Sequence, residues 1–121
     1  ISGAKHTPPA PYHIKEEMEK LMNWYKQETK QMHPVTRGAL LHALFVGIHP
    51  FIDGNGRTSR LLLNLELMKD GFPPVIIKVE NRLDYYEALD KAHTQEDYDD
   101  FIQLVAKEVE DSLDLYLNAI E

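Results

Sequence analysis

The segment 34–48 is small or apolar on several sides when it is drawn as a helix. The residues that give this pattern are Ala39, Leu40, Ala43, Leu44, Val46 and Gly47. Pro34 is favourable in the first turn of a helix, which sets the expected start. A helix that is apolar on all sides has to be buried, so other elements must pack around it.

Four further segments carry apolar residues at helical spacing with charged residues between them. We expect helices over about 12–31, 55–70, 81–93 and 96–120. Gly71 is a natural helix stop, and Pro73 and Pro74 reinforce it. The β-branched run 75–79 is too short to form a sheet of its own. The prediction is a single all-α domain around segment 34–48, with a Pro-rich loop at 1–11 and a helical core at 12–121.

Composition excludes several classes of protein. The 121 residues suffice for one compact domain. A net charge of −7 argues against a broad nucleic-acid surface. The absence of cysteine excludes disulfides, thiolate zinc sites and cysteine nucleophiles, and it fits a cytoplasmic location. No apolar run is long enough to cross a lipid bilayer, so we do not expect a membrane as a partner. Because the chain begins Ile-Ser-Gly, we expect it to be part of a longer protein.

The stretch from His49 to Arg60 joins the second and third expected helices and concentrates the chemistry. Residues 54–56, Gly-Asn-Gly, open a helix, where unpaired amides and the helix dipole favour an anion. The glycines let those amides approach a phosphate closely. Arg57 and Arg60 lie three residues apart on one helical face and can meet further phosphate oxygens.

Two other residues of this stretch complete the parts needed for phosphate-ester chemistry. Asp53 precedes the glycines, and one carboxylate together with substrate phosphates is the usual way to hold Mg²⁺. Histidine can exchange a proton near neutral pH, so His49 is a candidate general base. The Walker A and Rossmann spacings are absent. A shared transition-metal site with His42 is disfavoured, because two helical turns, roughly 10 Å, separate the histidines.

Segment 49–60 resembles the signature of the Fic family, His-x-Phe-x-Asp/Glu-Gly-Asn-Gly-Arg-x-x-Arg, and every fixed position matches. The resemblance extends to Pro8-Pro9, His33-Pro34, the stop at 71–74 and Tyr85-Tyr86, which are similar to features of the AMP-transferring branch. Residues 1–3 resemble the end of the β-hairpin flap that holds the target protein by strand addition.

This resemblance implies a protein adenylyltransferase that uses ATP as co-substrate and Mg²⁺, or Mn²⁺ in its place. His49 would deprotonate a Ser, Thr or Tyr hydroxyl of a target protein, which can be the chain itself. Asp53 would hold the metal. The amides of Gly54, Asn55 and Gly56, helped by the Asn55 side chain, would cradle the phosphates. Arg57 would neutralise them, and Arg60 would meet the terminal phosphate.

The resemblance also implies roles for three aromatic residues. Phe51 would anchor the loop in the core, and Tyr85 and Tyr86 would border the adenine pocket, although aromatic residues at this spacing are often core. His93 stands where similar sequences often carry Asn, which leaves the contacts to the base less defined.

Two alternatives to AMP transfer remain open at this stage. One is hydrolytic removal of AMP, and the other is a catalytically silent nucleotide-binding interaction module. Gly54 and Gly56 favour AMP transfer over the Doc-like kinase branch, which carries Ala and Lys there. Many members have an inhibitory Ser/Thr-x-x-x-Glu-Gly/Asn helix whose glutamate pairs with the last arginine. That motif is absent from this sequence, so we expect Arg60 to be free unless upstream sequence or another protein supplies the helix.

Overall fold

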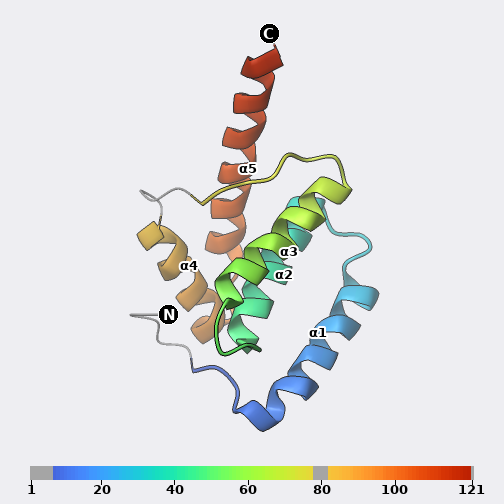
Figure 1. Ribbon diagram of the computed structural model, residues 1–121, viewed down its shortest axis with the longest axis vertical. Coiled ribbons are helices and arrows are strands. Elements are labelled where there is room, and N and C mark those ends of the chain that lie inside the picture. The colour runs from blue at the N-terminus through green and yellow to red at the C-terminus, as the bar shows by residue number, and fades with distance from the viewer. Residues whose placement is uncertain (1–6, 78–81, 121) are drawn as a thin grey trace.

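The computed structural model of the protein describes residues 7–77 and 82–120, and these residues are mostly helical (Figure 1). A single 3-10 turn, Pro11–His13, is followed by α1 Ile14–Glu28, α2 Pro34–Ile48, α3 Asn55–Lys69, α4 Arg82–Gln95 and α5 Asp99–Ile120. The described residues contain no strand. The predicted all-α class is confirmed.

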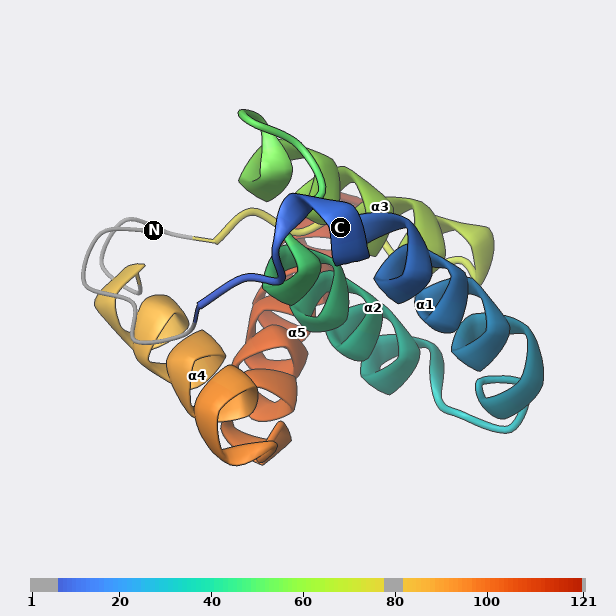
Figure 2. The same cartoon turned by 90° about the horizontal axis from the view of Figure 1, so that it is seen from below.

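Helix α2 is the centre of the domain, and it contacts each of α1, α3, α4 and α5. Figure 2 shows these four helices arranged around it. Ala39 and Ala43 are fully buried in α2, each with 0% of its surface exposed. Small side chains let neighbouring helices approach closely. The structure therefore confirms the expectation of a buried central helix over 34–48.

Helices α2 and α3 run antiparallel. At the end of the pair that lies opposite the loop 49–54, a polar network joins both helices to α1. The buried carboxylate of Glu66 accepts hydrogen bonds from the Tyr25 hydroxyl at 2.7 Å and from Arg37 Nε at 2.8 Å. Lys69 Nζ lies 3.1 Å from the second carboxylate oxygen, and Arg37 also pairs with Asp70. The network fixes one end of the α2–α3 pair, and the loop 49–54 connects the other end.

Helices α4 and α5 cover the opposite side of the core. Phe101 and Val105 of α5 are fully buried, and Leu89 of α4 packs in the same cluster. The C-terminal part of α5 extends past the other helices (Figure 1). Among the described residues, no helix is both long enough and apolar enough to span a lipid bilayer.

The helix ends differ from the sequence predictions at a few positions. Helix α5 begins at Asp99 instead of Glu96, because Glu96 has a left-handed backbone with φ 54. Helix α1 ends at Glu28 and does not reach Gln31. Residues 72–77 are extended, and the Asn64 side chain bonds both backbone groups of Val75. The expected flap end at 1–3 and residues 78–79 lie outside the described residues.

Candidate active site

His49 ends α2 and turns the chain into the loop 49–54. Its backbone is left-handed, with φ 56 and ψ 57, while its N–H still donates to the Phe45 carbonyl at 3.1 Å. Such a backbone costs a non-glycine residue about 1–2 kcal/mol. No hydrogen bond or ion pair to its ring comes from residues 7–77 or 82–120. The presence of histidine where glycine would be less strained supports a functional role for the imidazole.

The start of α3 has the open backbone amides that the predicted anion cradle requires. Gly54 caps the helix with φ 85, a left-handed conformation that favours glycine. The amides of residues 55–57 have no acceptor within the helix, and no side chain caps them. The Gly54 amide itself donates to Asp53 Oδ1 at 2.9 Å. The open amides therefore lie one residue later than the sequence predicted.

Both signature arginines fold back over this cradle. A β-carbon added at Gly54 would lie 3.1 Å from Arg57 Nη2, and one added at Gly56 would lie 3.2 Å from Arg60 Nη1. Helical side chains lean toward the N-terminus of their helix, so residues three or four positions later cover the first turn. The two glycines thus leave space for two guanidinium groups beside three open amides, although the whole chain is acidic.

Asp53 is the carboxylate nearest the cradle, and its side chain is 93% exposed. Its Oδ2 lies 3.8 Å from Arg57 Nη2. No group of three metal-ligating side chains occurs among the described residues. A single exposed carboxylate beside a phosphate cradle fits Mg²⁺, which keeps several waters and takes its other ligands from substrate phosphates.

Tyr85 lies inside the core, with only 4% of its surface exposed, rather than along an open pocket wall. Its hydroxyl is 2.6 Å from Nε2 of His42, which is fully buried. Burial raises the pKa of Tyr85 to about 12, although the Arg60 guanidinium interacts with the hydroxyl and opposes that shift. Sequence reasoning considered His42 only as a metal ligand. Its position on the most buried helix was the signal that could have predicted a core partner.

Comparisons with known proteins agree with this geometry. A model of the Fic/DOC family matches residues 1–67, more than half of the chain. The chain belongs to the Fic/DOC family. The resemblance that was based on segment 49–60 is therefore confirmed.

Relatives within the Fic/DOC family are named as protein adenylyltransferases. The chain is 46% identical to protein adenylyltransferase Fic of Nematostella vectensis over 93% of this chain and 26% of the relative. It is 42% identical to protein adenylyltransferase fic-1 of Caenorhabditis elegans over 97% of this chain and 23% of the relative. The chain thus spans about a quarter of the length of the curated relatives it matches.

Solved structures of Fic proteins share the fold. A structure of Fic-1 from C. elegans superposes with a TM-score of 0.85 at 41% identity, covering 99% of this chain and 36% of that one. A Fic-domain-containing signaling protein from Bacteroides thetaiotaomicron gives a TM-score of 0.81 at 32% identity, covering 91% of this chain and 47% of that one.

Two residues of the Fic signature differ from the roles that the sequence suggested. Phe51 is 50% exposed, so it does not bury its ring in the core, although the ring lies 6.1 Å from that of Phe45. The Asn55 side chain is buried and holds the loop instead. Its Oδ1 accepts from the Phe51 amide at 2.9 Å, and its Nδ2 donates to the Phe51 carbonyl at 2.7 Å. With both atoms engaged, this side chain anchors the loop and does not reach for a phosphate.

The other aromatic positions are only partly open. Tyr86 is half-buried, and its ring packs edge-on against Tyr85 at 5.2 Å. The His93 ring lies against Gly47 of α2, and its Nε2 bonds the Ala43 carbonyl at 2.7 Å. His93 therefore joins α4 to the central helix, whatever else it contacts.

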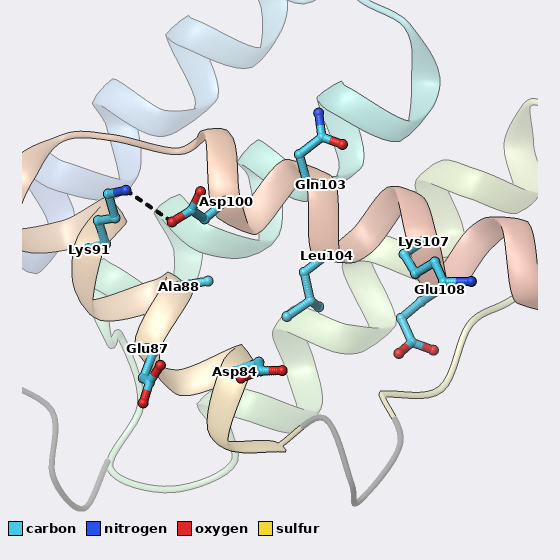
Figure 3. A pocket seen from close by; sticks show the side chains of 9 residues that line it. All are labelled: Asp84, Glu87, Ala88, Lys91, Asp100, Gln103, Leu104, Lys107 and Glu108. Atoms are coloured by element: carbon cyan, nitrogen blue, oxygen red, sulfur yellow. Dashed lines mark hydrogen bonds and ion pairs between the residues drawn. The ribbon is translucent and has the colours of Figure 1, made fainter.

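A separate pocket of about 560 Å³ lies between α4 and α5 (Figure 3). Its lining residues are Asp84, Glu87, Ala88, Lys91, Asp100, Gln103, Leu104, Lys107 and Glu108. Lys91 points toward Asp100, and their charged atoms are 3.0 Å apart. None of the predicted site residues lines this pocket. Its acidic groups outnumber its basic ones, which disfavours a polyphosphate there.

Replacing Gly56 with alanine is expected to separate stability from nucleotide binding. Alanine is favoured over glycine inside a helix by about 0.5–1 kcal/mol, so the fold should not weaken. The new β-carbon crowds Arg60 and should weaken ATP binding by about tenfold, the loss of one charge-assisted hydrogen bond. Calorimetric titration with ATP and urea unfolding would measure both effects.

Gly71→Ala is the matched control for that substitution. Gly71 has φ 87 and nothing within 4 Å of an added β-carbon, so the change strains the backbone without touching the cradle. We expect lower stability and unchanged ATP binding. Equal ATP affinities for Gly56→Ala and the unaltered chain would contradict the contact between Gly56 and Arg60.

The buried His42 should make the fold sensitive to mild acid. Burial lowers the pKa of His42 to about 4 from an ordinary 6.5, so the unfolded chain binds a proton more readily than the folded chain in this interval. Stability is complete above pH 6.5 and is lost as the pH falls toward 4. The free energy of unfolding should drop by about 2 kcal/mol between pH 7.5 and 5.

Urea unfolding at both pH values measures this drop, and His42→Leu/Tyr85→Phe should remove most of it. Burial alone would raise the pKa of Glu66, but hydrogen bonds from Tyr25, Lys69 and Arg37 hold it below its ordinary value. The contribution of the Glu66 carboxylate to stability is therefore lost only when the pH falls below the ordinary range of a glutamate pKa. A flat stability between pH 7.5 and 5 would show that His42 is not held neutral by burial.

Proposed function

We propose that this chain is the catalytic core of a protein adenylyltransferase, which transfers AMP from ATP to a Ser, Thr or Tyr hydroxyl of a protein. The observation that carries the proposal is one helix-loop-helix turn in which a strained His49 precedes three uncapped amides covered by Arg57 and Arg60. The names of the relatives support the same activity.

The first step of the proposed reaction is the activation of the hydroxyl. The neutral imidazole of His49 accepts the hydroxyl proton while the hydroxyl oxygen forms a bond to the α-phosphorus of ATP. The bond from that phosphorus to the bridging oxygen breaks, and pyrophosphate leaves with the electron pair. The products are an AMP ester of the target protein and pyrophosphate, and His49 carries the proton.

The cradle stabilises the charge that shifts onto phosphate oxygens during this step. The amides of residues 55–57 are already oriented by α3, so they need little reorganisation when the charge develops. Arg57 and Arg60 add two guanidinium groups, with Arg60 assigned to the terminal phosphate. Tyr86, which is half-buried, is the better candidate of the tyrosine pair to border the adenine.

Asp53 is the residue that would hold Mg²⁺, or Mn²⁺ in its place. A bound divalent cation supplies charge neutralisation of the phosphates and fixes their orientation. Asp53 suits this role because its side chain is exposed beside the cradle and one of its oxygens already accepts the Gly54 amide. The hydrogen bond holds the carboxylate at the mouth of the site.

Intact-mass measurement after incubation with ATP and Mg²⁺ tests the proposal, with the chain and a panel of added proteins as acceptors. A gain of one AMP unit on any of them, with release of pyrophosphate, is the expected result. A phosphate-sized gain would indicate kinase-like transfer instead. Loss of AMP from a previously modified protein would favour the hydrolytic alternative, and nucleotide binding without any transfer would favour the silent module.

A further inference from the structure

The apolar stripe of α5 continues beyond the part of the helix that is buried in the domain. Val105 and Val109 occupy this stripe where α5 packs on the core, and both are buried. Positions seven, eight and eleven residues after Val109 lie on the same side of the helix, and they are Tyr116, Leu117 and Ile120. These three are between 51% and 81% exposed, and the end of α5 that carries them extends past the other helices (Figure 1). An apolar stripe stabilises a helix only where it is packed, so this pattern indicates that a further element packs there.

A groove of about 620 Å³ lies beside this stripe, between α5 and the extended segment 72–77. Tyr116 belongs to both the groove and the stripe, and Leu115 and Ile76 add to the apolar wall of the groove. Leu115 is 68% exposed and Ile76 is 82% exposed. Single exposed apolar residues are common on proteins, whereas a group that adjoins a groove is typical of an interaction site. We call this group the distal face, and its members are Ile76, Leu115, Tyr116, Leu117 and Ile120.

Hydrogen bonds fix the extended wall of the groove. Ser112 of α5 donates from Oγ to the Pro74 carbonyl at 2.8 Å. From the other side, the Asn64 side chain of α3 bonds both backbone groups of Val75. The groove is therefore formed before any partner arrives, and little conformational entropy is lost from this wall when a partner binds.

The polar border of the distal face is acidic. From residue 107 to residue 120 the sequence has four carboxylates and a single cation, Lys107. Lys107 Nζ already lies 2.9 Å from Asp111 Oδ1, so the exposed Glu110 and Asp114 determine the sign of this surface. The last turn of α5, as far as Ile120, carries no basic residue to offset the negative end of the helix dipole. These charges favour a cationic occupant and disfavour a second copy of this chain, whose distal face is equally acidic.

We propose that the distal face is the docking site for a basic amphipathic helix of a partner protein. A helix fits because the stripe on α5 runs straight along the helix axis, and a partner helix meets such a stripe with anchors at positions i, i+3, i+4 and i+7. One large apolar side chain of the partner enters the groove beside Ile76, and its lysines or arginines face Glu110 and Asp114. Docking there is independent of AMP transfer, because no residue of the distal face belongs to the loop 49–54 or to the phosphate cradle.

Fluorescence anisotropy with a labelled synthetic peptide tests the proposal. The probe is a helix of about five turns, roughly 18 residues, with leucines at helical spacing on one face and lysines on the other. We expect the unaltered chain to bind it, and the Kd to rise about fivefold or more when NaCl is raised from about 50 mM to about 500 mM. A companion peptide with glutamates in place of the lysines should bind at least about tenfold more weakly. Failure to bind the lysine peptide, or equal binding of both peptides, would overturn the proposal.

Variants on and off the distal face locate the binding. Leu117→Gln changes the distal face, and Leu65→Gln on α3 is the matched control, since the two leucines are 52% and 54% exposed. The Kd for the lysine peptide should rise about tenfold in Leu117→Gln and less than about twofold in Leu65→Gln, while urea unfolds both at the same concentration as the unaltered chain. Glu110→Gln/Asp114→Asn should reduce the salt dependence. Equal Kd values for the two leucine variants would overturn the proposal.

Two measurements without peptide test the other occupants of the distal face. Sedimentation equilibrium should give the same oligomeric state for the unaltered chain and for Leu117→Gln. Vesicles of phosphatidylcholine and phosphatidylserine should not bind the chain, because the lipid surface and the border of the distal face are both negative. A dimer that Leu117→Gln dissociates, or vesicle binding that Leu117→Gln abolishes, would overturn the proposal. Absence of AMP transfer would contradict the proposed function alone and would leave the peptide result unchanged.

Discussion

Replacing His49 with alanine is expected to lower the rate of AMP transfer by about a hundredfold to ten-thousandfold, the usual contribution of a positioned acid–base group. The imidazole is the proposed acceptor of the hydroxyl proton. The uncapped amides and both arginines remain in His49→Ala, so ATP should bind with nearly unchanged affinity. Rates of AMP incorporation, measured beside calorimetric titration with ATP, would test both parts.

His49→Gly is the matched variant for that experiment. At φ 56 glycine is relieved of the strain that alanine retains, so His49→Gly should be more stable than His49→Ala by about 1 kcal/mol. Both variants should be equally inactive. Substantial AMP transfer by either one would remove His49 from the role of base. Equal stability of the two would indicate that the turn relaxes in the variants.

The helices could be predicted from sequence because their signals are local. The expected range 34–48 coincides with α2, since Pro34 marks its start and the apolar pattern continues to its end. The start of α5 was less predictable. Glu96 continues the charge pattern of a helix, yet its backbone is left-handed, and no residue type there signals the break.

The local geometry of the candidate site could be predicted where it depends on the backbone of consecutive residues. Glycines at the start of a helix were expected from the sequence, and Gly54 provides a left-handed cap there. The close approach of Arg60 to Gly56 became apparent only in the structure. The roles of Phe51 and Asn55 were not predictable in the same way. An asparagine beside glycines suits a ligand as well as a turn, and only the fold shows its two bonds to the Phe51 backbone.

Contacts between residues far apart in the sequence were the main feature that could not be predicted. Tyr85 and His42 are 43 positions apart, and Tyr25 and Glu66 are 41 apart. Each pair meets only because several helices pack around α2. A tyrosine pair on a helix suggests a pocket wall as readily as a core partner, and charged residues between apolar ones suggest a solvated face. Helix packing, which periodicity does not specify, decides between these readings.

Replacing Glu66 with alanine should destabilise the domain by about 3–5 kcal/mol, because it leaves a buried arginine without its main partner. The side chains of Arg37 and Glu66 are only 11% and 9% exposed. The Tyr25 hydroxyl loses both of its contacts with the carboxylate in the same change and keeps the hydrogen bond from Lys69 Nζ at 2.9 Å. Urea unfolding of Glu66→Ala would measure the loss, and a loss below about 1 kcal/mol, the range of exposed pairs, would contradict it.

Two controls locate the cause of that effect. Lys20→Ala breaks an exposed ion pair with Glu17, 3.4 Å long, and should leave stability almost unchanged. Arg37→Met/Glu66→Leu removes both charges of the buried pair and should recover much of the stability, because the cost in Glu66→Ala comes from leaving Arg37 with only the more exposed Asp70 as a partner. Arg37 lies twelve residues before His49, roughly 18 Å along α2. Folded Glu66→Ala should therefore keep the geometry of the loop, and its AMP transfer per folded molecule should match that of the unaltered chain.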